Sequence, residues 1–297
     1  MTTRELVRDG VRISYRTEGG GGPAVVLLPG FQLIDSRMWE GQVPDLARVA
    51  RVVSYDARGS GRSSKPLDPE AYTVAEMLAD ALAVLDTTSA EGTQAVLVGN
   101  SFGGALAYLL AALHPDRVAG IALLAPTVNI TGDADASFVA ARLRFDEDRG
   151  GPDHGWARYN RHAWRRDFAG FVEWFVHTAA PEPHAAATRR RAASWGMDSN
   201  ADLLAATVAT RAGVPPDEQA RTFRALAGAV RCPVLVLHGE RDEIVPPAWG
   251  RAVAQTLGAA FFSHPHAGHC PHVTDPAMVN RVLVDFLASV TSGRSAA

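Results

Sequence analysis

The chain has 297 residues, of which 47% are hydrophobic and 21% charged, and its formal net charge at pH 7 is -3. This composition is typical of a globular protein and excludes wholesale disorder and collagen-like or coiled-coil architecture. Charges of both signs are mixed along the chain without a concentrated basic stripe, so nucleic acid is not an expected partner.

The start of the chain gives no sign of export or membrane insertion. Its first ten residues carry the charges of Arg4, Glu5, Arg8 and Asp9 and no apolar segment, unlike a secretory signal. No apolar run approaches the ~20 residues that a membrane-spanning helix needs. We therefore expect a cytoplasmic protein without a membrane partner, either a monomer or a homodimer.

Short apolar runs alternate with helical patterns along most of the chain. Such runs are typical of strands buried on both faces, and they predict a mostly parallel central sheet flanked by helices, an α/β fold. The predicted strands are residues 25–28, 52–55, 95–98, 121–124, 234–237 and 259–263, and the predicted helices are residues 74–86, 101–113 and 278–290.

Residues 127–229 interrupt this alternation. They hold four of the six tryptophans and many Arg and His residues, without a convincing buried strand. We interpret them as a helical cap inserted into a core made of residues 1–126 and 230–297. Trp156, Trp164 and Trp174 are candidates to line an apolar substrate pocket, although packing of cap helices explains many such aromatic residues equally well.

Residues 99–103 read Gly-Asn-Ser-Phe-Gly and join a predicted buried strand to a predicted helix. A serine in this setting lies on a sharp, strained turn, and the flanking glycines remove side chains that would clash there. The hydroxyl of Ser101 is thereby exposed above the sheet as a candidate nucleophile. The N–H group of Phe102 points to the same place and can stabilise an oxyanion. Asn100, beside the serine, is a candidate substrate contact.

A serine hydroxyl needs a base, and that base needs an acid to hold its tautomer. Asp242 lies in the loop after the predicted strand at 234–237, and His269 lies in the loop after the predicted strand at 259–263. Loops at one edge of a parallel sheet can bring both side chains to Ser101. The sequence therefore predicts a catalytic triad of Ser101, His269 and Asp242.

Neighbouring residues offer alternatives for the acid and the base. Glu240 and Glu243 are the next candidates for the acid. His272 is the alternative base, three residues after His269, but the glycine before His269 permits the tighter turn. Two histidines flanking Cys270, without another ligand group nearby, make a poor zinc motif, so no metal is expected.

A second oxyanion donor is expected from the loop after the first predicted strand, which reads Pro29-Gly30-Phe31-Gln32. Gly30 permits a close backbone approach, so the N–H group of Phe31 is the candidate. Gln32 is a candidate substrate contact through its side chain, with a surface position as the alternative.

Taken in order, these landmarks resemble the α/β-hydrolase superfamily, within it the capped, serine-nucleophile branch of esterase-like and RsbQ-type proteins. The resemblance covers nearly all of the chain outside residues 127–229 and implies an α/β-hydrolase fold. In similar proteins the segment that holds Asp56 and Arg58 supports the active site structurally. The sequence landmarks that carry the resemblance are residues 29–31, residues 55–63, the Ser101 turn, Asp242 and the Gly268-His269 pair.

Two comparisons with the family refine the expectation. Many relatives carry His-Gly where this chain has Pro29-Gly30, which removes a side-chain contact but keeps the backbone donors. Relatives that open epoxides or remove halides carry an aspartate in place of Ser101, so these two reactions are disfavoured.

The leading functional hypothesis is hydrolysis of a carboxylic ester or related acyl bond through an acyl-enzyme. The expected substrate is a small to medium, largely apolar molecule, and no cofactor is expected. The same triad also serves carbon–carbon bond hydrolysis, lyase, perhydrolase or natural-product tailoring reactions, which a fold does not separate. A third hypothesis is a ligand-sensing or signalling protein that turns over slowly.

Overall fold

The structure is a computed structural model that describes residues 3–89, 93–150 and 153–294. Within this part of the chain, an eight-stranded sheet has the order β1-β2-β4-β3-β5-β6-β7-β8. Strand β2 is antiparallel to both of its neighbours, and all the other neighbouring strands are parallel. The strands are β1 (Thr3–Arg8), β2 (Val11–Glu18), β3 (Ala24–Leu28), β4 (Arg51–Tyr55), β5 (Ala95–Asn100), β6 (Val118–Leu124), β7 (Val234–Gly239) and β8 (Ala260–His264).

The predicted mostly parallel sheet is thus confirmed, and each of its six predicted strands is present with small shifts at the ends. Strands β1 and β2 lie outside that set because they form the antiparallel edge of the sheet. The side chains of β1 are exposed or partly buried, and those of β2 are buried only at its centre. Neither strand therefore has the continuous apolar run that is typical of a strand buried on both faces.

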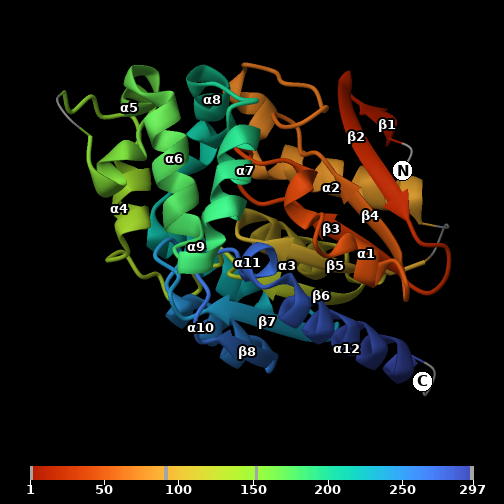
Figure 1. Ribbon diagram of the computed structural model, residues 1–297. Helices are drawn as coiled ribbons and strands as arrows, with labels where there is room; N and C mark the ends of the chain where they lie inside the picture. Colours follow the sequence, from red (N-terminus) through yellow and green to blue (C-terminus); the bar gives the residue numbers. More distant parts are fainter. Residues whose placement is uncertain (1–2, 90–92, 151–152, 295–297) are drawn as a thin grey trace.

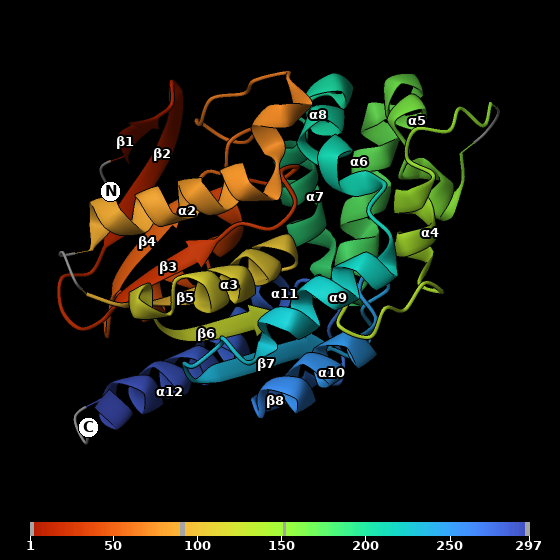
Figure 2. The ribbon, with the colours of Figure 1, turned by 180° about the vertical axis from the view of Figure 1, so that it is seen from behind.

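Helices cover both faces of the sheet because successive side chains of each buried strand point to opposite sides. Val26 and Leu28 of β3 pack on one side, where α2, α3 and α10 contribute, and Val25 and Leu27 pack on the other side with α1 and α12. Figure 2 shows α2 and α3 across the first face, and Figure 1 shows α12 along the second. The bounds of these helices are α1 (Val43–Leu46), α2 (Val74–Thr88), α3 (Phe102–Leu113), α10 (Pro247–Leu257) and α12 (Pro276–Arg294).

The spacing of apolar residues in helix α12 determines which of its faces packs against the sheet. Val279, Leu283 and Leu287 recur every fourth residue and are almost completely buried against the sheet. Residues at this spacing share one face of a helix. Burying each such side chain stabilises the fold by roughly 1.5–3 kcal/mol. The predicted helix at 278–290 is confirmed by this packing.

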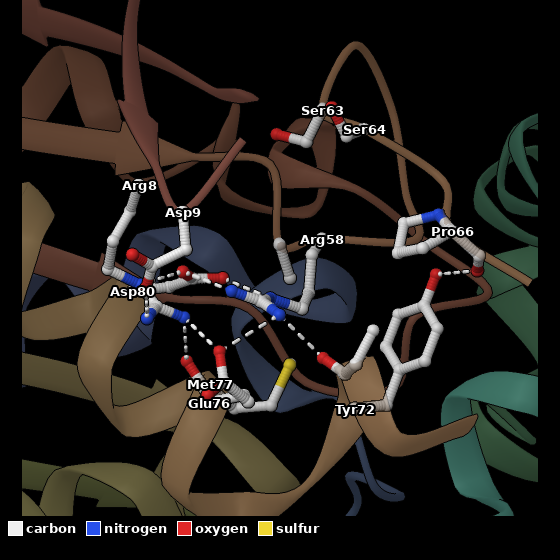
Figure 3. Close-up of polar contacts among 12 residues, drawn as sticks. Arg8, Asp9, Arg58, Ser63, Ser64, Pro66, Tyr72, Glu76, Met77 and Asp80 are labelled. Carbon is white, nitrogen blue, oxygen red and sulfur yellow. Dashed lines mark hydrogen bonds and ion pairs between the residues drawn. The ribbon is translucent and has the colours of Figure 1, made fainter. Parts of the chain in front are cut away.

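Helix α2 also buries a carboxylate, Asp80, whose partners come from distant parts of the chain (Figure 3). Asp80 Oδ2 accepts a hydrogen bond from Arg58 Nε at 2.6 Å, and Oδ1 accepts one from Arg58 Nη2 at 2.7 Å and one from Arg8 Nε at 2.9 Å. The side chains of Asp80 and Arg58 are each only 2% exposed. Arg58 therefore anchors the segment after β4 to α2.

The described part of residues 127–229 holds helices and no strand. Figures 1 and 2 show the arrowheads of the parallel strands pointing toward these helices, which we call the inserted helices. Phe145, Tyr159, Trp164 and Phe171 form an aromatic cluster among them, into which Leu33 from the loop after β3 packs. The inserted helices are α4 (Ser137–Leu143), α5 (Arg161–Arg166), α6 (Phe168–Ala179), α7 (Ala186–Gly196), α8 (Ala201–Ala212) and α9 (Pro216–Ala227).

Among the helices of the described residues, none is both long and apolar enough to cross a bilayer.

Candidate active site

Ser101 lies at the sharp turn between β5 and α3, with φ 54° and ψ -118°. A positive φ is rare in a residue that carries a Cβ, and strain of this kind costs about 1–3 kcal/mol. Hydrogen bonds hold the strained residue in place. Its N–H group donates to the Leu124 carbonyl at 2.9 Å, and its carbonyl accepts from the Thr127 N–H group at 3.1 Å.

The two flanking glycines are required by close backbone contacts. A Cβ on Gly99 would lie 2.2 Å from the carbonyl oxygen of Gly103, and a Cβ on Gly103 would lie 2.4 Å from the carbonyl oxygen of Leu28. No larger residue fits at either position without a shift of the backbone. The Gly-x-Ser-x-Gly spacing is therefore a steric requirement of this turn.

The structure brings Asp242 and His269 together. Asp242 Oδ2 lies 2.8 Å from His269 Nδ1, while Asp242 Oδ1 accepts the N–H groups of Ile244 at 2.8 Å and Val245 at 2.9 Å. Burial by itself would raise the pKa of Asp242, but the charge of His269 and hydrogen bonds from two histidines hold this pKa well below its usual range. Asp242 is therefore ionised at neutral pH.

The two alternative acids lie elsewhere. Glu240 forms an ion pair with Arg251 and accepts a hydrogen bond from Ser263, and Glu243 is exposed. Neither forms a hydrogen bond or ion pair with His269 in the described residues.

His238, at the end of β7, is the second histidine that contacts Asp242. Its Nε2 atom lies 3.0 Å from Asp242 Oδ2 and 3.0 Å from the carbonyl oxygen of Val245. Both of these oxygens can only accept, so we assign the proton of the neutral ring to Nε2. His238 thus helps to fix Asp242. No role was predicted for His238, although it stands four residues before Asp242 on the strand that leads into the loop.

Asn100 connects the Ser101 turn to the loop of His269. Its Nδ2 group donates to the carbonyl oxygen of Leu124 at 3.1 Å and to that of His269 at 3.1 Å. Both amide hydrogens therefore bind protein backbone, which positions the His269 loop. The N–H group of His269 donates in turn to the Ala179 carbonyl at 3.0 Å. A substrate contact by Asn100 stays a prediction.

His272, the alternative base, is buried against Trp39, with ring centroids 4.6 Å apart. Burial, together with the charge of His269, lowers the pKa of His272 to about 3. Burial, together with the charges of Asp242 and Glu182, raises the pKa of the Cys270 thiol. Both groups are therefore neutral at pH 7.

The loop after β3 runs beside the candidate nucleophile. A Cβ on Gly30 would lie 3.1 Å from the Asn100 carbonyl oxygen and 3.5 Å from Ser101 Cβ. The backbone at Gly30 therefore approaches the Ser101 turn closely, as expected from the sequence. Phe102 is the first residue of α3, so its N–H group has no acceptor within the helix. The oxyanion role of the Phe31 and Phe102 N–H groups stays a prediction.

Asp56 supports this loop from the end of β4. Its Oδ1 atom accepts hydrogen bonds from the Ser36 N–H group at 3.1 Å and the Ser36 hydroxyl at 2.6 Å. Its Oδ2 atom accepts one from the Arg62 N–H group at 2.9 Å. Asp56 and Arg58 thus stabilise the segments beside the site from within the fold.

Two cavities meet at Ser101. The larger has a volume of about 300 Å³ and the smaller about 80 Å³, and Phe31, Ser101 and Phe175 line both of them. His269 lines the smaller cavity. Among the residues that line the larger one are Phe102, Phe138, Tyr159, Trp249, Arg142 and Arg211.

Four predicted substrate contacts, Gln32, Trp156, Trp164 and Trp174, are not among the lining residues of either cavity. Trp164 is fully buried in the aromatic cluster, and Trp156 packs edge-on against Trp174 with ring centroids 5.2 Å apart. Gln32 is also buried. The aromatic walls of the larger cavity are instead formed by Phe, Tyr and Trp249. Direct contact of these four residues with substrate stays a prediction that this placement does not favour.

A mostly parallel sheet with a strained serine at a strand-to-helix turn defines a class of proteins, the hydrolases of the α/β type. Residues 23–276 match the model of the family described as the alpha/beta hydrolase fold. The chain belongs to this family.

Known proteins agree with the assignment. A segment of 101 residues is 46% identical to epoxide hydrolase B of Mycobacterium tuberculosis, and it spans 34% of this chain but only 28% of that relative. The chain is 30% identical over 301 residues to 2-hydroxymuconate semialdehyde hydrolase of a Pseudomonas strain, covering 96% of this chain and 93% of the relative. The solved enol-lactonase of Burkholderia xenovorans superposes with a TM-score of 0.75 at 22% identity, covering 96% of this chain and all of that one. The chain thus shares the α/β-hydrolase fold with proteins that are named as hydrolases.

Proposed function

We propose that the protein hydrolyses a carboxylic ester or related acyl bond through an acyl-enzyme formed on Ser101. His269 acts as the base and Asp242 orients it. The observation that carries the proposal is the 2.8 Å contact between Asp242 Oδ2 and His269 Nδ1, at a loop that shares a cavity with Ser101.

The protonation states follow from this contact. Ionised Asp242 only accepts hydrogen bonds, so it holds the proton of neutral His269 on Nδ1 and leaves the lone pair of Nε2 free. Nε2 takes the proton of the Ser101 hydroxyl as the oxygen attacks the substrate carbonyl. The N–H groups of Phe31 and Phe102 stabilise the resulting oxyanion.

The rest of the cycle uses the same groups. Collapse of the tetrahedral intermediate breaks the bond to the leaving group, which takes its proton from His269 Nε2. Water then enters, gives a proton to His269 and attacks the acyl-enzyme. His269 then returns this proton to Ser101 as the acid product leaves. His269 thus mediates every proton transfer of the cycle.

The domain organisation is part of the proposal. Residues 127–229 form a cap over a core made of residues 1–126 and 230–297. Support comes from the separate aromatic cluster of the inserted helices and from the larger cavity, to which Phe138, Tyr159 and Phe175 of this segment contribute walls. A cavity with mainly apolar walls suits a small to medium organic substrate.

Rapid mixing with p-nitrophenyl acetate tests this function. We expect a burst of one nitrophenolate per protein molecule followed by steady turnover, because the acyl-enzyme forms before it is hydrolysed. Ser101→Ala should lose both phases, whereas the exposed-site control Ser194→Ala should keep both. Absence of burst and turnover in the wild-type protein would contradict the proposal. A burst without turnover would favour the sensing hypothesis instead.

A further inference from the structure

The larger cavity holds two arginines in mainly apolar walls. Arg142, from α4, and Arg211, from α8, both line it together with Ser101. Burying a charge without a partner is costly, so buried guanidinium groups are normally paired with carboxylates. Among the described residues, neither arginine forms an ion pair. The hydrogen bonds of each side chain therefore decide what it does.

Arg142 has a structural role. Its Nη1 group donates to the carbonyl oxygens of Arg211 at 2.6 Å and Ala212 at 3.1 Å, and its Nη2 group donates to that of Val214 at 2.7 Å. These carbonyls belong to the end of α8 and the residues after it, where a helix leaves its acceptors unpaired. Arg142 thus ties α4 to the end of α8 and fixes the backbone at Arg211.

Only part of the Arg211 guanidinium is hydrogen-bonded. Its Nη2 group donates to Gln32 Oε1 at 3.1 Å, and its Cζ atom lies 4.0 Å from the centroid of the Phe102 ring. Phe102 directly follows Ser101, and both line the same cavity as Arg211. The Nη1 atom of Arg211 is buried and has no hydrogen-bond partner. The protein therefore orients this guanidinium and leaves one of its donors unused.

The surroundings do not neutralise Arg211. Burial is the main cause that lowers the pKa of Arg211 to about 10; Tyr159 acts to raise this pKa and the charge of Arg142 acts to lower it. The guanidinium is still charged at neutral pH. Glu218 is the acidic residue among those that line the cavity, but it is exposed and forms no ion pair with Arg211 in the described residues. The cavity thus carries an uncompensated positive charge.

We propose that Arg211 binds a carboxylate on the acyl part of the substrate, so that the preferred substrates are monoesters of short dicarboxylic acids. This inference rests on the proposed function, whose acyl-enzyme it places in the larger cavity. A guanidinium with a free Nη1 group is a good donor to a planar carboxylate. The apolar walls between Ser101 and Arg211 suit the methylene chain between the two carbonyl carbons.

The two cavities bind different parts of the proposed substrate. His269 must protonate the leaving group, so the alcohol lies on the side of His269, in the cavity of about 80 Å³. The acyl chain then extends into the cavity of about 300 Å³, which contains Arg211. Hydrolysis adds water across the ester bond and releases the alcohol and a dicarboxylate. The carboxylate bound by Arg211 takes no part in the bond changes.

Binding to Ser101→Ala protein tests the inference without turnover. Monomethyl succinate, glutarate and adipate are titrated calorimetrically, each against the neutral methyl ester of the same chain length. A hydrogen bond to a charged group contributes enough for about 10- to 100-fold tighter binding of at least one monoester. Adding Arg211→Gln should abolish this preference. Adding Arg144→Gln, which changes an exposed arginine on the same segment, should preserve it.

Turnover of proteins that keep Ser101 gives a second readout. We expect kcat/KM for the favoured monoester to exceed that for its neutral counterpart, and Arg211→Lys to retain part of the preference by keeping the charge. Equal binding and equal turnover of the charged and neutral esters would overturn the inference while leaving the proposed esterase function intact. Selective binding without any hydrolysis would contradict the proposed function and support the carboxylate site.

Discussion

Asp242→Asn is expected to lower kcat for ester hydrolysis about ten-thousandfold while the protein keeps its fold. Asp242 Oδ1 accepts the N–H groups of Ile244 and Val245, so the carbonyl oxygen of the asparagine should take that position. Its NH2 group then faces His269 Nδ1 and donates to it. The imidazole proton is forced onto Nε2, so His269 can no longer accept the proton of Ser101.

The two neighbouring carboxylates provide matched controls. Glu240→Gln and Glu243→Gln remove exposed charges from the same loop and should leave kcat close to the wild-type value. Steady-state kinetics with p-nitrophenyl acetate measures all three variants, and circular dichroism shows whether each is folded. A larger loss in either glutamate variant, or near wild-type activity in Asp242→Asn, would mean that Asp242 does not orient the base.

Asp80→Asn should lower the free energy of unfolding by about 3–5 kcal/mol. The substitution leaves the buried guanidinium of Arg58 and the partly buried one of Arg8 without their shared carboxylate. Glu76 contacts both arginines but is itself 38% exposed, so it compensates only in part. Thermal and urea denaturation measure the loss, which is expected as a drop of several degrees in Tm.

Asp86→Asn is the control on the same helix. Asp86 forms an ion pair with Arg117, but its side chain is 52% exposed. Exposed pairs contribute only about 0–1 kcal/mol because water and salt screen them. A similar loss of stability in Asp80→Asn and Asp86→Asn would show that burial of the Arg58 pair does not matter for the fold.

The parallel core was predictable from the sequence because its signals are local. Short apolar runs are typical of strands buried on both faces, and they occur at residues 25–28, 95–98 and 234–237. The turn at Ser101 is also marked locally, by the Gly-x-Ser-x-Gly spacing between a predicted strand and a predicted helix. The order of the loops after β7 and β8 was enough to place Asp242 beside His269.

The remaining features depend on contacts between distant segments. Asn100 binds the His269 backbone, 169 positions away, and Arg211 contacts Gln32, 179 positions away. No spacing in the sequence marks such pairs. The tryptophans illustrate the same limit, because composition shows that residues 127–229 are aromatic but not which rings face a cavity. Trp164 packs inside the aromatic cluster, whereas Phe175 lines both cavities.

Covalent labelling at Ser101 tests the central claim most directly. A fluorophosphonate reacts with a serine only when a base activates the hydroxyl and an oxyanion site receives the phosphoryl oxygen. Intact-mass measurement and peptide mapping of the native protein should find one adduct, on Ser101, and Asp242→Asn should acquire it far more slowly. No adduct on the folded wild-type protein, or an adduct on a different residue, would contradict the account.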